Sequence, residues 1–508
     1  MMDSFLLYQD SSTEGKKSYA FPRDIIKDLN LDILFKSMAR QDILMAEKIR
    51  RVMMIPLTTP EEVLYRQEVI RDFYRQSGVL EELYACAERQ HKALRLYKEE
   101  MKSNRAKSVK VTSTLLDSLN YLKQGQEELL HIRKLLAERQ EGWQSQGIKG
   151  LLKRLEEQQL QKIQEKLWEA EALITGCEAG YTFQFGGGLK LENAVLNYLR
   201  PAGDIKTGSL ESLYLKFVKK NAVLIGTDIM LKEDLNHLRE ATLKQLINMF
   251  QPYLQKLMQF FGEFTEEIAF YMGVVQFMKR MDSLNVTLTM PEPKSCGTTD
   301  TEFENLYELS MAVYAQKKPV GNSISLKNNR MTLITGANQG GKSTFLRSYG
   351  IAQVLMQCGM PVPAGRFSAP VYRQLFTHFT RSEDEQLSNG RLSEELQRMS
   401  SMVDQAVPDS LFLLNESFAS TTEKEGSKIA EGILRAFYEK NMTTMMVTHL
   451  YQLAKKLYEE QPEGSHFLVA ERTENGTRTF KMLRGEPAYT SFGTDLFKVL
   501  EEEEHNMK

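Results

Sequence analysis

The chain has 508 residues, a formal net charge of −2, and 42% hydrophobic and 26% charged residues. A chain of this length exceeds what one hydrophobic core organises, and about two to four domains are expected. The near-neutral total excludes a chain that is basic throughout. Any contact with nucleic acid must therefore come from a local basic surface.

The four cysteines are widely spaced and form no C-x-x-C pair: Cys86, Cys177, Cys296 and Cys358. This spacing favours a reduced interior over a disulfide framework or a zinc site. The N-terminal residues show no basic region followed by an apolar stretch, as a signal peptide would. No apolar run approaches the ~20 residues that span a bilayer. We therefore expect a cytoplasmic protein.

The chain from about Asp24 to Asp282 is rich in Leu, Glu, Lys and Gln and has the periodicity of helices. Two stretches carry apolar residues at alternating steps of three and four, which predicts one apolar stripe facing a partner helix. The more regular stretch, which starts at Phe250, would form a helix of roughly 40 Å. A plain helical bundle and a mechanical lever are both open interpretations. The stripes are Leu115, Leu119, Leu122, Leu129, Ile132 and Leu136, and Phe250, Leu254, Leu257, Phe261, Phe264, Ile268, Tyr271, Val275 and Met278.

One stretch inside the helical region has a different pattern. "GYTFQFGGGLKLENA" (Gly180 to Ala194) alternates aromatic residues and then carries three glycines. Alternation followed by glycine predicts a short strand or hairpin and a loop between helices. The glycines are not followed by G-K-[ST], so the structural interpretation is favoured over a phosphate site.

The composition changes after Asp282, where "NVTLTMPEPKSCGTTD" is typical of a domain junction. Beyond it, short β-type runs alternate with helical ones: "RMTLIT", "SLFLLN", "TTMMVTH", "HFLVAE" and "RTFKML". This order predicts an α/β domain with a largely parallel sheet, edged by an antiparallel hairpin around "ENGT". We therefore expect a multidomain chain, with an all-α core over residues 1–285 and an α/β domain over 286–508.

The strongest chemical motif is "TLITGANQGGKST", which satisfies G-x-x-x-x-G-K-[ST] and stands between a predicted strand and a predicted helix. Glycines let backbone N–H groups surround phosphates, and the following helix presents its positive end. Lys342 is expected to reach the β- and γ-phosphates, and Ser343 to ligate Mg²⁺. The predicted ATP site comprises Gly336, Ala337, Asn338, Gln339, Gly340, Gly341, Lys342, Ser343 and Thr344.

The apolar run "LFLLNESF" predicts a buried strand that ends at Asn415 and Glu416. A carboxylate at this place beside a phosphate loop can polarise the water that attacks the γ-phosphate, so Glu416 is a catalytic candidate. The residue before it normally helps to hold Mg²⁺ as a carboxylate. Asn415 can accept a hydrogen bond from metal-bound water without adding charge, and a simple cap at the strand end is the alternative.

His449 follows the apolar run "TTMMV". A single histidine is often structural. At the carboxyl end of a strand in a phosphate-loop domain, however, it lies on the edge of the sheet where ligands bind. His449 is therefore a second catalytic candidate, as a contact to the γ-phosphate.

These motifs resemble those of the MutS family. "TGANQGGKST" is similar to the family's TGPNMGGKST, and "GMPVPA", "NESFASTTEKEGSKIA" and "VTHLYQLA" follow in the family's order. Upstream, "DLNLDIL" and "MIPLTTPEEVLYRQEVIRDFY" resemble the start of the family's helical core. The resemblance covers roughly residues 28–500 and is strongest in the last third. It implies long lever helices, a reduced clamp within about residues 100–235, and an ABC-type ATPase domain.

The chain departs from the family pattern at several places. Asn415 replaces the Asp of the family's Asp-Glu pair, and "FASTTE" stands where the family has GRGTST. The signature serine that acts on a partner's nucleotide has no clear counterpart, with Ser388 and Ser393 as candidates. The domain that inserts an aromatic wedge beside a mismatch is also expected to be missing.

The resemblance implies an ATPase that uses ATP and Mg²⁺, forms a homodimer through its ATPase domains and couples closure to DNA binding in mismatch repair or a related process. Asn415 predicts slow hydrolysis. Basic clusters at Lys102 to Lys110 and Lys149 to Arg154 are candidate DNA contacts, or solvated helix faces. Two other functions are open: an ATP-gated binding module with little hydrolysis, and a ribosome- or RNA-associated ATPase.

Overall fold

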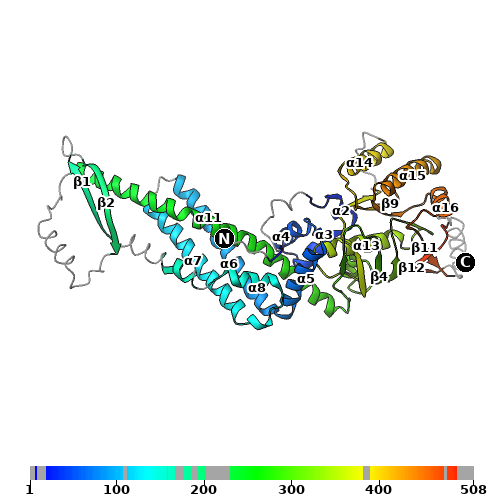
Figure 1. Ribbon diagram of the computed structural model, residues 1–508, viewed down its shortest axis with the longest axis horizontal. Coiled ribbons are helices and arrows are strands. Elements are labelled where there is room, and N and C mark those ends of the chain that lie inside the picture. The colour runs from blue at the N-terminus through cyan, green and yellow to red at the C-terminus, as the bar shows by residue number, and fades with distance from the viewer. Residues whose placement is uncertain are drawn as a thin grey trace, which may run out of the picture. The chain divides into compact units, whose positions relative to one another are not determined.

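The computed structural model describes residues 6–8, 19–106, 111–156, 158, 160–165, 167, 177–185, 191–201, 229–380, 390–473 and 477–488 (Figure 1). The chain divides into two compact units. Unit 1 comes mainly from Gly78–Trp143 and Ile148–Ile268. Unit 2 comes from Phe5–Ser77, Gln144–Gly147 and Ala269–Lys508.

Unit 1 is built chiefly from long helices. Its described elements are α6 (Ser77–Ala106), α7 (Val111–Ala137), η1 (Gln140–Gly142), α8 (Gln146–Arg154), β1 (Cys177–Phe185), β2 (Leu191–Pro201) and most of α11 (Ile229–Ser283). At 1.5 Å per residue, the 55 residues of α11 form a helix of roughly 80 Å. This is twice the length that the apolar stripe alone predicts, because the helix begins at Ile229, well before Phe250.

The predicted apolar stripes are largely buried. All six stripe positions of α7 are at most 5% exposed, and Leu254, Leu257, Phe261, Phe264 and Ile268 of α11 have the same low exposure. A Cβ at Gly125 of α7 would lie 2.4 Å from Leu257 Cδ2. The two stripes therefore meet at a close helix–helix approach, as expected for helices that bury one face each.

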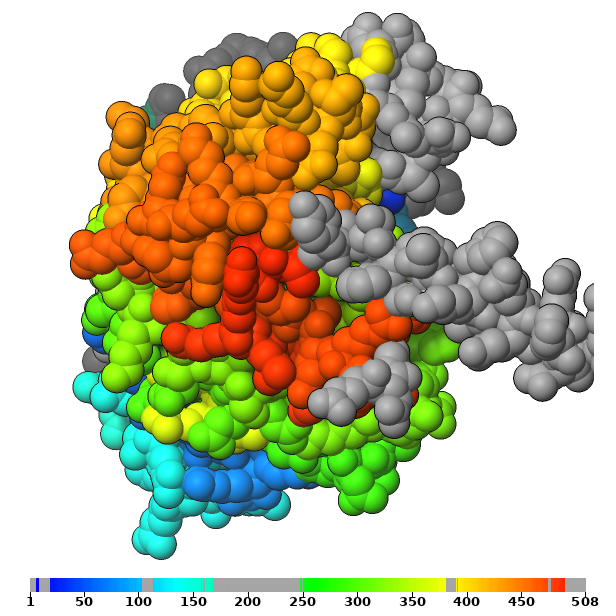
Figure 2. All heavy atoms as spheres, turned by 90° about the vertical axis from the view of Figure 1, so that its right-hand side faces the viewer, coloured from blue at the N-terminus to red at the C-terminus, as the bar shows by residue number. Residues whose placement is uncertain are grey.

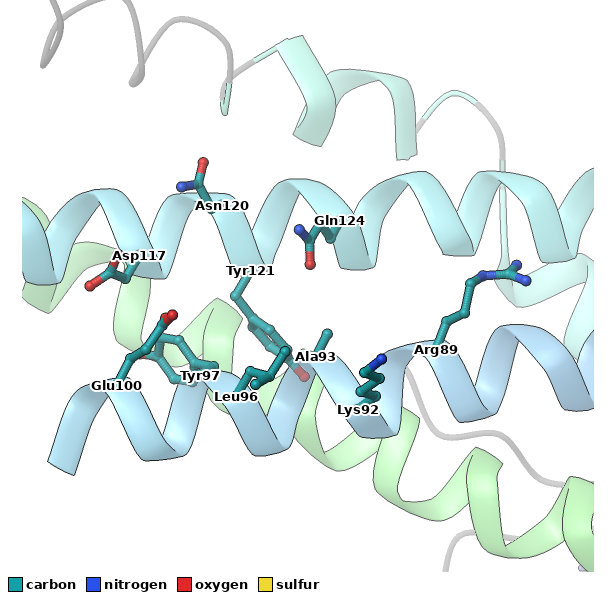
Figure 3. Close-up of a pocket in the computed structure, with 10 residues that line it drawn as sticks. All are labelled: Arg89, Lys92, Ala93, Leu96, Tyr97, Glu100, Asp117, Asn120, Tyr121 and Gln124. Atoms are coloured by element: carbon teal, nitrogen blue, oxygen red, sulfur yellow. The ribbon is translucent and has the colours of Figure 1, made fainter. Parts of the chain in front are cut away.

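A second contact of unit 1 lies between α6 and α7. Tyr97 and Tyr121 stack with ring centroids 5.0 Å apart, and the Tyr97 hydroxyl lies 3.2 Å from the Ser118 hydroxyl. Both rings line a groove of about 370 Å³ with polar residues at its rim, among them Lys92 and Gln124 (Figure 3).

The expected strand or hairpin within the helical region is present. β1 and β2 pair in antiparallel fashion, with Cys177 opposite Pro201 and Phe185 opposite Leu191. The glycines between the strands lie outside the described residues.

The helices that begin unit 2 carry clear start signals. Asp42 caps α4 (Ile43–Met53) by accepting the Met45 N–H at 3.0 Å. Thr59 caps α5 (Pro60–Arg75) in the same way, through the Glu62 N–H. These side chains satisfy backbone donors that have no partner inside the helix. The two preceding helices are α2 (Asp24–Asp28) and α3 (Leu31–Met38).

The main sheet of unit 2 has six strands in the order β12-β11-β6-β10-β9-β8. The five strands from β11 to β8 are mutually parallel, and β12 is antiparallel at the edge, as the sequence predicted. The strands are β6 (Met331–Thr335), β8 (Leu375–Phe379), β9 (Leu411–Asn415), β10 (Thr443–Val447), β11 (Ser465–Arg472) and β12 (Arg478–Arg484).

Helices cover both faces of this sheet. On one face, apolar residues of the strands form a continuous core with α14 (Arg391–Gln405), α15 (Glu423–Glu439) and α16 (Tyr451–Glu460), which lie together in Figure 1. On the other face lies α13 (Lys342–Gln357), so close that a Cβ at Gly350 would lie 2.7 Å from Leu413. Helices on both faces are expected for a mostly parallel sheet, because such a sheet is buried on both sides.

A smaller sheet of four strands packs against the other side of α13. Its order is β3-β7-β4-β5. Phe303 lies 6.0 Å from Phe345 and 6.1 Å from Tyr349, measured between ring centroids, so an aromatic cluster joins this sheet to α13. The elements are β3 (Glu292–Lys294), β4 (Thr301–Leu306), β5 (Asn322–Leu326), β7 (Arg366–Pro370) and the short helix α12 (Leu309–Ala315).

The far edge of the main sheet is contacted by an N-terminal side chain. The Tyr19 hydroxyl accepts the N–H of Leu375 at 2.8 Å and donates to the Leu375 carbonyl at 3.0 Å. One phenol group thus satisfies both backbone groups of this residue of β8.

Within the described residues, no helix is both long and apolar enough to cross a membrane. The domain boundary at residues 285 and 286 stays a prediction. The mixed helical and α/β character is confirmed.

The turn before β11 offers a test of backbone strain. Gly464 has a φ of +72°, and a Cβ there would lie 2.2 Å from the carbonyl oxygen of Asn328. We expect Gly464→Ala to lower the urea midpoint of unit 2 markedly, since it adds a backbone clash to a left-handed conformation that costs about 1–2 kcal/mol. Gly297→Ala is the matched control, because Gly297 has a φ of +88° with open space around it. Equal losses in the two variants would contradict the clash.

Candidate functional site at the carboxyl edge of the main sheet

The glycine-rich loop connects the end of β6 to the start of α13. Gly336 and Gly341 have φ values of +115° and +88°, which L side chains rarely adopt. A Cβ at Gly340 would lie 2.8 Å from the Cβ of Ala470 on β11. The turn therefore needs glycine at positions 336 and 341, and the close approach of β11 needs glycine at position 340. The loop leaves the first N–H groups of α13 without partners inside the helix.

Lys342, the first residue of α13, lies against the loop. Its Nζ donates to the carbonyl oxygens of Gly336 at 2.8 Å and Ala337 at 3.0 Å. The residue is 5% exposed. Burial lowers the pKa of the Lys342 amine, and the charge of Glu416 raises it. Lys342 is therefore a buried, hydrogen-bonded group that packs against the loop.

Glu416 and His449 form a pair at the same edge of the sheet. They follow β9 and β10, and the imidazole Nε2 of His449 lies 2.8 Å from Glu416 Oε1. The hydrogen bond from His449 is the largest cause of a lowered pKa of Glu416, and the charges of His449 and Lys342 add to it, against the effect of burial. Glu416 is therefore held as a carboxylate near neutral pH.

The backbone at Glu416 is unusual for a residue with a side chain. Its φ is +57°, and its N–H donates to the Val447 carbonyl at 2.9 Å. Thr380 contributes a further contact, since its hydroxyl donates to the Glu416 carbonyl at 2.9 Å. A left-handed non-glycine residue must be held by its surroundings. Thr380 was not predicted as a site residue, because it acts through a hydrogen bond to a backbone carbonyl group.

Asn415 is placed at the end of β9, opposite Val447 of β10. Its Oδ1 is buried and has no hydrogen-bond partner among the described residues. A strand-end cap that uses this amide oxygen is therefore not formed. An unpartnered buried oxygen costs free energy unless a ligand, an ion or water satisfies it.

The glycine-rich loop, Lys342, Glu416 and His449 line a cavity of about 650 Å³. Apolar side chains on other elements complete its lining: Met311 of α12, Val320 before β5, and Phe480 of β12. Figure 2 shows the C-terminal strands, drawn in red, at the surface of unit 2 beside the orange helices α15 and α16. The apolar wall had no motif in the sequence, because it forms only when the β11–β12 hairpin and α12 pack around the loop.

The structure brings most of the predicted site residues to this cavity. Those that line it are Asn338, Gln339, Gly340, Gly341, Lys342, Ser343, Thr344, Glu416 and His449. Gly336 and Ala337 do not line it and instead provide carbonyl oxygens to Lys342. Asn415 lies beside Glu416 but is not part of the lining. Ser388 is outside the described residues, and Ser393 is exposed on α14.

The available metal ligands are oxygen atoms. Among the described residues, no three His, Cys, Asp or Glu side chains are grouped as a metal site would require. The Ser343 hydroxyl and the unpartnered Asn415 Oδ1 are nevertheless the hard oxygen ligands that Mg²⁺ prefers when phosphates complete its shell. The residues therefore fit a metal whose coordination shell is completed by phosphate oxygens.

Comparison with known proteins gives two family matches. Residues 332–504 match MutS domain V, and residues 58–284 match the MutS2 N-terminal domain. The chain is 34% identical over 166 residues to the DNA mismatch repair protein MutS of Shouchella clausii, which is 32% of this chain and 19% of that protein. It is 31% identical over 170 residues to the protein of that name from Thermus aquaticus, which is 33% of this chain and 20% of that protein.

A third relative is the MutS protein homolog him-14 of Caenorhabditis elegans, 27% identical over 185 residues, covering 36% of this chain and 22% of that protein. The matches thus span about a fifth of each of these relatives. The fold and the loop define a protein with a helical part and an α/β domain of the MutS domain V type. The two family matches together cover more than half of the chain, and it belongs to the MutS family.

The buried position of Lys342 yields a direct test. We expect Lys342→Met to weaken binding of Mg-ATP about 100-fold, since it removes a charged hydrogen-bond donor worth on the order of 1.5–3 kcal/mol and keeps the apolar stem. Isothermal titration with Mg-ATP measures the affinity, and circular dichroism checks the fold. Lys424→Met, at an exposed position of α15, is the control. Unchanged affinity in Lys342→Met would exclude this loop as the phosphate site.

Proposed function

We propose that the chain binds and slowly hydrolyses ATP at this cavity and couples the nucleotide state to DNA binding. The observation that carries the proposal is the meeting of Lys342, Glu416 and His449 beside the glycine-rich loop, although the three come from different segments of the chain. The relatives named DNA mismatch repair proteins support a role in mismatch repair or a related repair or recombination process.

The residues divide the chemistry between them. The loop N–H groups and Lys342 bind the β- and γ-phosphates. Glu416, held as a carboxylate, orients water for attack on the γ-phosphorus, with cleavage of the bond to the bridging oxygen and release of ADP and phosphate. His449 donates to Glu416 Oε1 and thereby fixes the carboxylate. The apolar wall of Met311, Val320 and Phe480 suits the base of the nucleotide.

Mg²⁺ would be held by Ser343 and, through a metal-bound water that donates to its amide oxygen, by Asn415, and when bound it would neutralise charge on the phosphates. An amide adds no charge where an Asp would, so we propose weaker metal binding and slow turnover. A long-lived ATP-bound state suits a clamp better than a fast motor.

For the α/β domain we propose an ABC-type arrangement in which two copies of the chain pair and enclose ATP. Exposed apolar side chains on one face of α14, Leu396 at 38% and Val403 at 43% exposure, support an interface there. The long helix α11, which contributes to both units, is proposed to act as a lever.

DNA contact is proposed for unit 1. Lys149 and Lys153 are both exposed on α8 and stand four residues apart, on one face of the helix. Such spacing lets both ammonium groups reach a phosphate backbone. The basic cluster Lys102 to Lys110 is the second proposed contact, and Lys102 at its start is exposed on α6.

Asn415 decides the rate in this proposal. We expect Asn415→Asp to raise steady-state ATP turnover several-fold, a change on the order of 1 kcal/mol in activation free energy, and to lower the Mg²⁺ concentration that is needed. Because Oδ1 is buried without a partner, the added charge should also lower the thermal midpoint without metal, and Mg-ATP should restore it.

Two other variants make that measurement decisive. Glu416→Gln should reduce turnover about 100-fold or more while ATP still binds. Asn285→Asp adds the same charge at an exposed position and should change neither turnover nor the Mg²⁺ requirement. If Asn415→Asp behaves like Asn285→Asp, the amide plays no part in metal binding.

The DNA proposal is tested by charge removal. We expect Lys149→Gln with Lys153→Gln to weaken binding to homoduplex, mismatched and branched DNA alike. The slope of the logarithm of the binding constant against the logarithm of the salt concentration should fall by the equivalent of up to about two phosphate contacts. The control is Lys424→Gln with Lys428→Gln, an exposed pair with the same spacing on α15. We expect less than a tenfold preference, about 1.4 kcal/mol, for mismatched over matched duplex. Binding to ribosomes or RNA without binding to DNA would support the alternative function instead.

A further inference from the structure

The turn that follows Glu416 is an unusual piece of backbone. Glu416 and Phe418 both have positive φ values, +57° and +64°. Each such non-glycine residue is strained and persists only where neighbours impose the conformation. The Glu416 N–H is held from β10, through the Val447 carbonyl at 2.9 Å. What holds the other side of the turn therefore decides where the Glu416 carboxylate points.

Helix α14 provides one of these contacts. The Oε2 of Glu395 accepts the Phe418 N–H at 2.9 Å in a buried environment. Glu395 is only 9% exposed and Phe418 is fully buried. A hydrogen bond from a backbone N–H to a buried carboxylate is among the stronger kinds in proteins. It fixes the backbone two residues after Glu416 to the position of α14.

Strand β8 provides the second contact. His378 is fully buried, its Nδ1 lies 2.7 Å from the Ser417 hydroxyl, and its ring stacks on Phe418 with 5.8 Å between ring centroids. Its Nε2 lies 3.3 Å from the carbonyl oxygen of Glu395. The Ser417 hydroxyl also donates to the backbone carbonyl oxygen of His378 at 3.0 Å, so both the ring and the backbone of His378 contact this residue of the turn.

We propose that Glu395 and His378 are positioning residues that couple the location of α14 to the direction of the Glu416 carboxylate. This inference rests on the proposed ATPase function and adds regulation to it. The phosphate loop is carried by β6, which β10 and β9 separate from β8 in the sheet. A displacement of α14 therefore changes the rate of hydrolysis and leaves nucleotide binding nearly unchanged.

Variants of Glu395 separate this role from a merely structural one. Glu395→Ala removes the acceptor of the Phe418 N–H, whereas Glu395→Gln keeps a side-chain oxygen in its place. We expect Glu395→Ala to speed amide exchange of the peptide that contains Phe418 about tenfold in the nucleotide-free protein, and to lower kcat about tenfold with KM unchanged. Glu395→Gln should restore both values toward those of the parent protein.

Ser417→Ala is a milder second variant, since it removes one hydroxyl and leaves the backbone intact. It should lower kcat in the same direction without a change in KM. Ser368→Ala is the matched control, because Ser368 of β7 is also a buried serine and its hydroxyl has no hydrogen-bond partner among the described residues. It should change neither exchange at the turn nor kcat.

The outcomes are distinct. Exchange at Phe418 that stays at the parent rate in Glu395→Ala overturns the coupling, whatever the ATPase activity. Faster exchange with unchanged kcat also overturns it, because the turn would then not set the position of Glu416. A parent protein that hydrolyses no ATP would refute the proposed function instead, and the exchange rates alone would then decide whether α14 holds the turn.

Discussion

The parallel pairing of β6, β10 and β9 is the constraint on which the site depends. Val447 at the end of β10 lies opposite Ile334 of β6 and opposite Asn415 of β9. In parallel strands all carboxyl ends share one edge of the sheet. The loop after β6, the carboxylate after β9 and the imidazole after β10 therefore come together, although more than a hundred residues separate the first from the last. A shift of one residue in either pairing would move these groups apart.

The charge pattern at that edge follows from the same pairing. Lys342 and Glu416 are each within the electrostatic reach of the other, and each pKa responds to the other's charge. His449 adds a donor to Glu416, and Asn415 adds an oxygen without charge. The site thus keeps its positive and negative groups nearly balanced.

The sequence predicted the parts of the site that local patterns encode. Lys342 stands in a motif, and Glu416 and His449 follow apolar runs that mark strand ends. Phe480 and Met311 were not predicted, because an apolar side chain carries no sign of the cavity that it lines. The pattern also did not show that residues 5–77 join the C-terminal unit, since helix periodicity says which face is buried but not which neighbour buries it.

The contact of Tyr19 with β8 has a consequence for the chain outside its own fold. β8 is the last strand of the sheet, and an edge strand offers unpaired N–H and C=O groups to other chains. By engaging both backbone groups of Leu375, the Tyr19 phenol occupies the place where a foreign strand would begin to pair. A residue near the N-terminus thereby occupies one pairing position on the edge strand, and covered edges are one way in which proteins avoid edge-to-edge aggregation.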